Sequence, residues 1–331
     1  MKWLAWISMV ACLLTATVVR AEEDETAFKA TLRAVVAVGW RGQDMREVER
    51  LSQEFRASRA RALSGAWKSR LLHGVLREEI DQAISRGEGW ASLREKSARW
   101  ARESRDAPVA ELFHADVIVR QAWSIRGHEY ANKVSAANMQ AFGQLIGQAS
   151  VYLQSVKKTA AIDPEWYALM LDCFVLSGAS TENVWAMLAE ATTREPGYMP
   201  TYYAAMERFS PKWGGSEAEL ENFIQRAAPL AGDRQEETYA RLYARVIQLH
   251  ALSHFASSKA DCHRVVRGMQ AFLAGYPDSF NVNMAARVAG ACGDKEFALQ
   301  LIGRIGDHPM ADVWGKPPAI AFEGLKRWAS Q

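Results

Sequence analysis

No motif of a familiar catalytic or nucleotide-binding chemistry occurs in the sequence. There is no Gly-x-Ser-x-Gly nucleophile elbow, no Cys-x-x-Cys pair and no glycine-rich loop ending in Gly-Lys-Ser or Gly-Lys-Thr. Long alternating apolar and polar runs, which are typical of half-buried strands, are also absent. These absences weigh against a serine hydrolase, a thioredoxin-type redox protein, a P-loop nucleotide-binding protein and a β-sheet fold.

The first residues have the pattern of an export signal. Lys2 precedes an uncharged apolar run, which ends in the small-residue cleavage pattern Val19-Arg20-Ala21. We therefore expect residues 1–21 to be a signal peptide and the mature chain to be exported, either periplasmic or secreted. The apolar run is slightly short for a transmembrane helix, so a retained anchor is less favoured, as is a lipid attached at Cys12.

Little net charge remains once this segment is removed. The full chain has 40 basic and 38 acidic side chains, and the segment contains Lys2 and Arg20, which leaves 38 of each sign. No strong field then favours nucleic acid. No second apolar segment of spanning length follows, so we expect no nucleic-acid partner and no membrane span after cleavage.

Apolar residues recur three and four positions apart along nearly the whole chain, which predicts an all-α protein. Asp163-Pro164 and the pair Ser216 and Glu219 are helix-start signals, because they supply capping acceptors and a proline at the first helical position. Signals of this kind predict helix pairs at 164–177 with 181–194, 200–210 with 216–229, and 279–291 with 295–304. Single helices are predicted at 234–257 and 262–273.

The spacing of these pairs predicts a repeat architecture. Pro164 and Pro200 are 36 residues apart, near the roughly 34-residue period of tetratricopeptide units. Short breaks between helices favour antiparallel neighbours. We therefore expect residues 159–331 to form a tetratricopeptide-like α-solenoid of antiparallel helix pairs. An N-terminal helical region without a clear period, residues 22–158, precedes it, either as a separate bundle or as part of the stack.

Five short segments occur in an order that is similar to a known family: Ser64-Gly65-Ala66-Trp67-Lys68, Ala122-Trp123-Ser124-Ile125-Arg126-Gly127, Asp163-Pro164-Glu165-Trp166-Tyr167, Glu195-Pro196-Gly197-Tyr198 and Pro211-Lys212-Trp213-Gly214-Gly215-Ser216. Together they make residues 45–250 resemble a bacterial family known only as a tetratricopeptide-like domain of unknown function. The resemblance implies helical repeats and brings no established reaction, so it assigns no catalytic residue. Helical-repeat proteins generally present extended surfaces to other proteins.

Trp213 and Arg126 are the two candidate ligand-surface residues. Trp213 could stack on a ligand, but a structural role is favoured. In that role Trp213 packs inside a helical hairpin, Gly214-Gly215 form the turn and Ser216 caps the next helix. Arg126 ends an apolar helix and could bind a ligand or donate hydrogen bonds between helices. Other tryptophans lie within apolar periodicity, which favours core packing over a glycan-stacking surface: Trp67, Trp123, Trp166 and Trp185.

Three cysteines follow the predicted signal peptide. Cys173 lies in an apolar run and is predicted to be a buried free thiol. Cys262 and Cys292 fall on helices that could be neighbours, so they are a candidate disulfide, with the bridged and unbridged states both open. His250 and His254 are four residues apart, but no further ligand stands at a spacing that completes a metal site. We expect no metal, no cofactor and no catalytic residue.

The sequence therefore predicts an exported helical-repeat protein that binds another protein or a peptide and is not an enzyme. One alternative is a cell-envelope enzyme acting on peptidoglycan, which requires a carboxylate of raised pKa in a concave pocket. Another is a glycan-binding module, which requires several exposed tryptophans along one groove. The identity of the partner and the oligomeric state stay open.

Overall fold

The structure is a computed structural model that describes residues 25–127 and 129–331, except for the side chains of residues 131 and 250–254. The predicted signal peptide lies outside the described residues. The described part is helical and contains no β-strand, with a single isolated bridge between Arg61 and Trp67. The prediction of an all-α protein is confirmed. None of the helices in the described part is long and apolar enough to cross a membrane.

The helices fall into three consecutive groups along the chain. The first comprises α1 (Glu25–Gly42), α2 (Arg46–Ser58), α3 (Lys68–Ser85), α4 (Trp90–Glu103) and α5 (Pro108–Arg126). The second comprises α6 (Ala136–Ser155), α7 (Lys157–Ala160), α8 (Glu165–Leu176), α9 (Thr181–Arg194), α10 (Met199–Glu207), α11 (Glu217–Ala227) and α12 (Gln235–Ala256). The third comprises α13 (Cys262–Gly275), α14 (Ser279–Ala291), α15 (Lys295–Ile305), α16 (Ala311–Trp314) and α17 (Pro318–Ala329). Short 3-10 turns are η1 (Ala131–Lys133), η2 (Pro211–Trp213) and η3 (Ala228–Arg234).

The predicted helices agree with these bounds to within a few residues, because the capping side chains act as the sequence indicates. The Ser216 hydroxyl accepts a hydrogen bond from the Glu219 backbone N–H at 3.2 Å. The Asp163 carboxylate accepts one from the Glu165 backbone N–H at 3.0 Å. Helices α16 and α17 were not predicted, because glycines and prolines interrupt the periodicity between residues 306 and 318.

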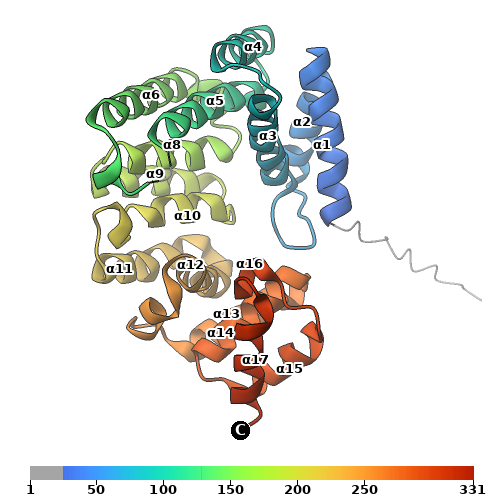
Figure 1. The fold of residues 1–331 in the computed structure, drawn as a ribbon, viewed down its shortest axis with the longest axis vertical. Coiled ribbons are helices and arrows are strands. Elements are labelled where there is room, and N and C mark those ends of the chain that lie inside the picture. Colours follow the sequence, from blue (N-terminus) through green and yellow to red (C-terminus); the bar gives the residue numbers. More distant parts are fainter. Residues whose placement is uncertain (1–24, 128) are drawn as a thin grey trace, which may run out of the picture.

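Figure 1 shows helices α5 to α12 following one another along one side of the molecule. Helices α1 to α3 lie beside the first of them, and α13 to α17 lie at the opposite end. The contacts agree with this view, because α8 packs against α6, α9 and α10, and α12 packs against α10, α13 and α14. The chain therefore bends so that its first and last helices come to the same side.

Two large clusters of buried side chains hold the fold together, and α5 belongs to both; a third, small one joins Trp67, Ala168 and Tyr198. The smaller of the two large clusters joins α1 to α5, and the larger one extends from α5 to α17. Helix α5 is buried continuously from Pro108 to Val119, which is typical of a helix covered on all sides. Phe142 and Ile146 of α6 lie in the larger cluster. The predicted boundary at residue 158 therefore runs through one continuous core.

Candidate functional site

The loop between α2 and α3, residues 59–67, leaves its own helices and reaches toward the C-terminal half (Figure 1). The Asn281 side-chain amide on α14 donates a hydrogen bond to the Ser64 carbonyl oxygen at 3.0 Å. Gly65 has a φ of +77°, and a Cβ there would overlap the rings of Tyr276 and Phe272. Only glycine therefore fits this position, and the α2–α3 loop closes the open side of the helical stack.

The same loop is fixed to the turn between α9 and α10. The Trp67 indole N–H donates to the Gly197 carbonyl oxygen at 3.3 Å, and Arg59 pairs with Glu195 at 2.7 Å. The Trp67 ring also lies edge-on to Tyr198, with ring centres 5.4 Å apart. These contacts place the N-terminal helices across from α8, α10 and α12, with a cleft between them.

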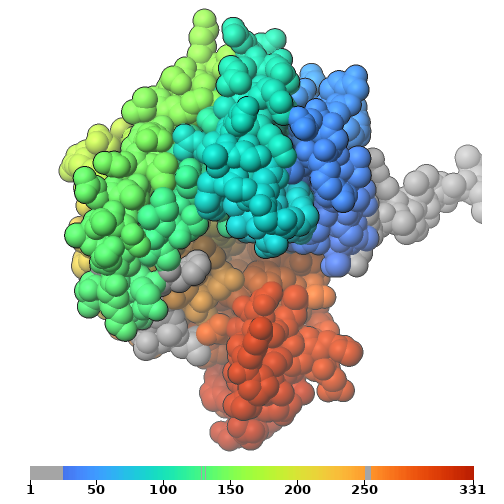
Figure 2. Space-filling model, turned by 45° about the horizontal axis from the view of Figure 1, so that its top comes forward, coloured from blue at the N-terminus to red at the C-terminus, as the bar shows by residue number. Residues whose placement is uncertain are grey.

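The cleft contains two adjoining cavities. The inner cavity, of about 400 Å³, lies between the α2–α3 loop with α3 on one side and α8, α10 and α12 on the other. The outer cavity, of about 1060 Å³, lies between α1 with the α2–α3 loop on one side and α12, α13, α14 and α16 on the other. In Figure 2 the surface is hollowed between the N-terminal helices, in blue to cyan, and the C-terminal helices, in red. The two cavities share Ala66, Arg70, Tyr203, Arg241 and Arg245, so they form one continuous cleft.

Four arginines reach the inner cavity from the α2–α3 loop, α3 and α12: Arg61, Arg70, Arg241 and Arg245. Two of them are neutralised, because Arg70 pairs with Glu165, and Arg241 pairs with Glu237 at 3.1 Å. Arg61 and Arg245 have no carboxylate partner in the described part of the chain. The inner cavity is therefore lined by two guanidinium groups that form no direct ion pair within the described part of the chain.

The environment of each unbalanced guanidinium is distinct. Arg61 donates to the carbonyl oxygens of Gly65 and Gly197, at 3.0 and 3.4 Å, and lies 5.0 Å from the centre of the Trp67 ring. Burial, with the like charges of Arg234 and Arg241, outweighs the opposing effects of Tyr276 and Glu237 and lowers the pKa of Arg61 from its ordinary value.

Arg245 lies over the ring of Tyr203, 5.4 Å from its centre, and donates to the Gln248 side-chain oxygen at 2.9 Å. Its Nε–H is buried without a hydrogen-bond partner. A buried donor that stays unpaired costs free energy, about 1–3 kcal/mol in typical cases. Arg245 is therefore a group that a bound acceptor would stabilise.

Two carboxylates line the same inner cavity, Asp172 on α8 and Glu207 on α10. Neither forms a hydrogen bond or an ion pair with any described residue. Asp172 is open to the cavity but enclosed by protein, and this desolvation raises its pKa to about 7, against the opposing charges of Arg77 and Arg70. Asp172 therefore ionises less readily than an ordinary aspartate.

A buried ion network lies behind the inner cavity and joins α3, α5 and α8. Glu165 is fully buried and accepts hydrogen bonds from Arg70, from Arg77 at 2.5 Å and from the Tyr198 hydroxyl. Arg77 also donates to Asp116 on α5 at 2.9 Å. Burial opposes the charge on Glu165, but the positive charges of Arg70 and Arg77 outweigh it and lower its pKa to about 2. The network fixes Arg70 in the wall of both cavities.

The same interface holds a buried histidine. His73 on α3 faces Asp163, with Nε2 and the carboxylate oxygen 3.1 Å apart. Burial alone would lower the pKa of His73, but the charge and the hydrogen bond of Asp163 raise it. The N-terminal helices are therefore held to α8 by pairs of opposite charge as well as by apolar packing.

The structure brings the two candidate ligand-surface residues to one place, away from the cleft. Trp213 in η2 lies edge-on to Trp123 of α5, with ring centres 6.5 Å apart. The guanidinium of Arg126 lies 5.1 Å from the centre of the same Trp123 ring and donates to the Gly127 carbonyl oxygen at 3.1 Å. Trp213 and Arg126 are half-buried. Neither lines the inner or the outer cavity.

The other tryptophans also pack within the protein. Trp67 and Trp166 are buried, and Trp123 and Trp185 are half-buried against the larger core. None of the tryptophans in the described part is exposed, and Trp67 alone among them lines the cleft. This arrangement does not favour a groove of stacking tryptophans for a glycan.

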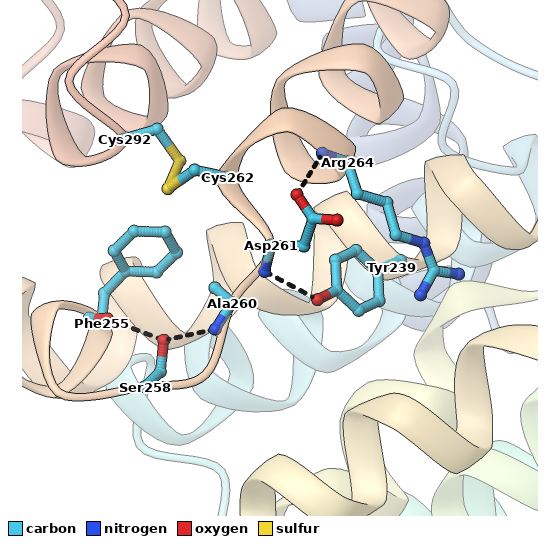
Figure 3. The surroundings of a disulfide bond; sticks show 8 residues. All are labelled: Tyr239, Phe255, Ser258, Ala260, Asp261, Cys262, Arg264 and Cys292. Atoms are coloured by element: carbon cyan, nitrogen blue, oxygen red, sulfur yellow. Dashed lines mark hydrogen bonds between the residues drawn. A yellow bond between two sulfur atoms is a disulfide. The ribbon is translucent and has the colours of Figure 1, made fainter.

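The cysteines line neither cavity of the cleft. Cys262 at the start of α13 and Cys292 after α14 form a disulfide, with Cα atoms 5.2 Å apart (Figure 3). Cys173 is a buried free thiol. The side chains of His250 and His254 lie outside the described residues. Among the residues that are described, no three His, Cys, Asp or Glu side chains group so as to hold a metal ion.

The segments that carry the family resemblance meet in two places. Ser64–Lys68, Asp163–Tyr167 and Glu195–Tyr198 come together at the inner cavity, where Trp67 contacts Tyr198 and Tyr198 donates to Glu165. The other two segments meet in the contact between Trp123 and Trp213. All five therefore lie where distant parts of the helical stack touch.

The described part of the chain is helical and has a cleft that contains charges of both signs. The α2–α3 loop forms part of one wall of this cleft. Comparisons of the chain with protein-family models, with curated proteins and with solved structures find no match. The similarity to the tetratricopeptide-like family therefore stays a prediction that rests on the five segments.

Proposed function

We propose that this chain is an exported, tetratricopeptide-like α-solenoid and a non-catalytic binding module of the cell envelope, with a protein or peptide as partner. The solenoid of antiparallel helix pairs is supported by the contacts of α8 with α9, α10 with α11, and α14 with α15, each across a short break. Stacked helix pairs create extended concave surfaces, which helical-repeat proteins use for binding.

The observation that carries the binding proposal is the cleft between the N-terminal helices and α8 to α16. Its inner part presents charged groups without an ion-pair partner in the described part of the chain. Its outer part mixes charged side chains with apolar ones, the latter including Met269, Met284 and Met310. Methionines adapt their shape to different ligands, and a few convergent polar groups set orientation. A peptide chain offers both kinds of group, because its backbone and ends are polar and its side chains vary.

Filling the junction of the two cavities is expected to abolish peptide binding. Ala66 lines both cavities, so Ala66→Phe places a ring in the cleft without changing any charge. Phage-displayed linear peptides selected on the purified wild-type protein should bind Ala66→Phe at least about 100-fold more weakly, because the ligand would have to displace the ring.

Ala57→Phe is the matched control, since Ala57 is exposed on α2 and lines neither cavity. The control should bind the selected peptides as the wild-type protein does, and thermal melts should show that both variants fold. Equal binding by the wild-type protein and a folded Ala66→Phe variant would place the binding surface elsewhere. Failure to select any peptide would count against the proposed function itself.

A second candidate function, a cell-envelope enzyme acting on peptidoglycan, is favoured by one observation. Asp172, with its pKa raised to about 7, shares the inner cavity with Glu207. A carboxyl group of raised pKa that shares a cavity with a second carboxyl group is a requirement of acid–base cleavage of glycosidic bonds. Release of soluble sugars from purified cell wall would separate the two functions, since a binding module releases none.

A further inference from the structure

The charges of opposite sign occupy different walls of the inner cavity. Asp172 lies on α8 and Glu207 on α10, whereas Arg241 and Arg245 lie on α12 and Arg61 lies on the α2–α3 loop. Helix α10 contacts both α8 and α12, so the three helices follow one another along this face. The cavity is therefore acidic toward α8 and basic toward α12.

The basic wall carries more positive charge than the protein neutralises. Glu237 is the carboxylate that faces this group; it lies 3.1 Å from Arg241 and 4.0 Å from Arg234. Arg234, which acts on Arg61 by its charge but lines neither cavity, has a buried Nη1 without a hydrogen-bond partner, as Arg245 has a buried Nε. Like-charged guanidinium groups that are close and partly desolvated repel one another, so an anionic group bound among them would stabilise the folded chain.

An anion alone does not fit the whole cavity. Glu207, and Asp172 in its ionised form, would repel it, and their own oxygens have no donor within the described part of the chain. A ligand that carries an ammonium group as well as an anionic group would complement both walls. The ligand must be short, because the inner cavity of about 400 Å³ is near the lower end of the range that holds small molecules.

We infer that the inner cavity binds a short peptide as a zwitterion, with the α-carboxylate at Arg245 and Arg61 and the α-ammonium at Asp172 and Glu207. The inference rests on the proposed peptide-binding function and specifies its ligand. A guanidinium binds a carboxylate through two parallel hydrogen bonds, which sets the orientation of the peptide. Side chains of the ligand extend into the outer cavity, where Phe272 and three methionines line the wall.

Blocking either end of the peptide tests this assignment. The probes are tripeptides Ala-X-Ala with X varied, each in its free, N-acetylated and C-amidated form, with affinities measured by isothermal titration calorimetry. We expect C-amidation to weaken binding at least about 30-fold, and N-acetylation about 10-fold, because each removes one charge from a partly desolvated pair.

Two variants test which wall of the inner cavity binds each end of the peptide. Arg245→Gln should bind the free and the amidated peptide with nearly equal affinity, and Asp172→Asn should bind the free and the acetylated peptide with nearly equal affinity. Arg267→Gln and Asp233→Asn are the matched controls, since both residues are exposed and line neither cavity. The controls should keep the full effect of blocking each end.

The outcomes separate this inference from the proposed function. If amidated and acetylated peptides bind as tightly as free ones, the zwitterion site is wrong, while the binding of longer peptides would still support a peptide-binding module. If inorganic phosphate competes as well as the free peptide, the cavity is an anion site only, and the inference also fails. If neither tripeptides nor longer displayed peptides bind, both proposals fail.

Discussion

Replacing Glu165 by glutamine is expected to lower the free energy of unfolding by about 3–5 kcal/mol at pH 7, the usual cost of breaking a buried ion pair. Glu165 is fully buried and accepts hydrogen bonds from Arg70, Arg77 and Tyr198. Glutamine keeps the shape but removes the charge, so two guanidinium groups remain beside each other. Asp116 remains as a partner of Arg77, but it does not pair with Arg70.

Urea unfolding followed by far-ultraviolet circular dichroism measures this loss. The matched control is Glu78→Gln, because Glu78 also accepts two hydrogen bonds from an arginine, Arg33, but both side chains are largely exposed. Exposed pairs contribute about 0–1 kcal/mol, so the control should unfold almost as the wild-type protein does. A Glu165→Gln variant within about 1 kcal/mol of the wild type would show that the network does not hold the fold.

The loss should also depend on pH with a definite sign. The pKa of Glu165 is lowered to about 2 in the folded chain, below the value of about 4.3 for an unperturbed glutamate. The stability that its charge contributes is therefore complete above about pH 5 and is lost as the pH falls toward 2. A pKa shift of this size corresponds to about 3 kcal/mol of unfolding free energy. The difference in unfolding free energy between the wild type and Glu165→Gln should therefore shrink in acid.

Glu165 also connects stability to the cleft. It fixes Arg70, which lines both cavities, and Tyr198, which packs against Trp67 of the α2–α3 loop. A loosened network would therefore widen the inner cavity as well as weaken the fold. Peptide affinity and stability should fall together in Glu165→Gln, whereas Arg245→Gln should lower affinity without lowering the unfolding midpoint.

The helices of this chain could be predicted from the sequence because their signals are local. Ser216, Asp278 and Asp294 each accept a hydrogen bond from a backbone N–H at the start of the helix that follows them. Apolar spacing located the helices between such caps. The path of the α2–α3 loop could not be predicted, because its contact from Ser64 to Asn281 joins residues 217 positions apart.

The residues of the candidate site could not be predicted from the sequence for a related reason. Arg241 and Arg245 are four residues apart on α12, a spacing equally typical of a solvated helix face, and only the fold turns that face into a cleft. Asp172 did leave a signal, since it is a single carboxylate within the apolar stretch Trp166–Val175. A charge in such a run is either paired in the core or open to a cavity, and the sequence does not distinguish the two.

Removing the disulfide is the change with the second large expected effect. The double variant Cys262→Ser with Cys292→Ser should lose about 3–4 kcal/mol of unfolding free energy, since the bridge closes a loop across a sequence separation of 30 and restricts the unfolded chain. The unfolding midpoint in guanidinium chloride measures the loss.

Reductant supplies the control for this variant. Dithiothreitol should lower the stability of the wild-type protein to that of the double variant and should leave the double variant unchanged. A wild-type protein that is insensitive to reductant would show that the bridge does not stabilise the fold.

The position of the disulfide indicates what else should change. It ties the start of α13 to the end of α14. Next to it, Asp261 in the loop before α13 donates a hydrogen bond from its backbone N–H to the hydroxyl of Tyr239 on α12, at 3.1 Å (Figure 3). Helices α13 and α14 supply Met269, Phe272 and Met284 to the outer cavity. Peptides long enough to enter the outer cavity should lose affinity in the double variant, whereas tripeptides held at the inner cavity should lose less.

The bridge also connects the fold to the proposed export. Disulfides persist in oxidising compartments and are reduced in the cytosol. If the chain is exported, native protein taken from the producing cells without reductant should leave Cys262 and Cys292 unlabelled by an alkylating reagent. Cys173 should react only after unfolding, because it is buried and burial raises the pKa of its thiol to about 12, which leaves little reactive thiolate. Prompt labelling of Cys262 and Cys292 in the native protein would contradict both the export and the structural role of the bridge.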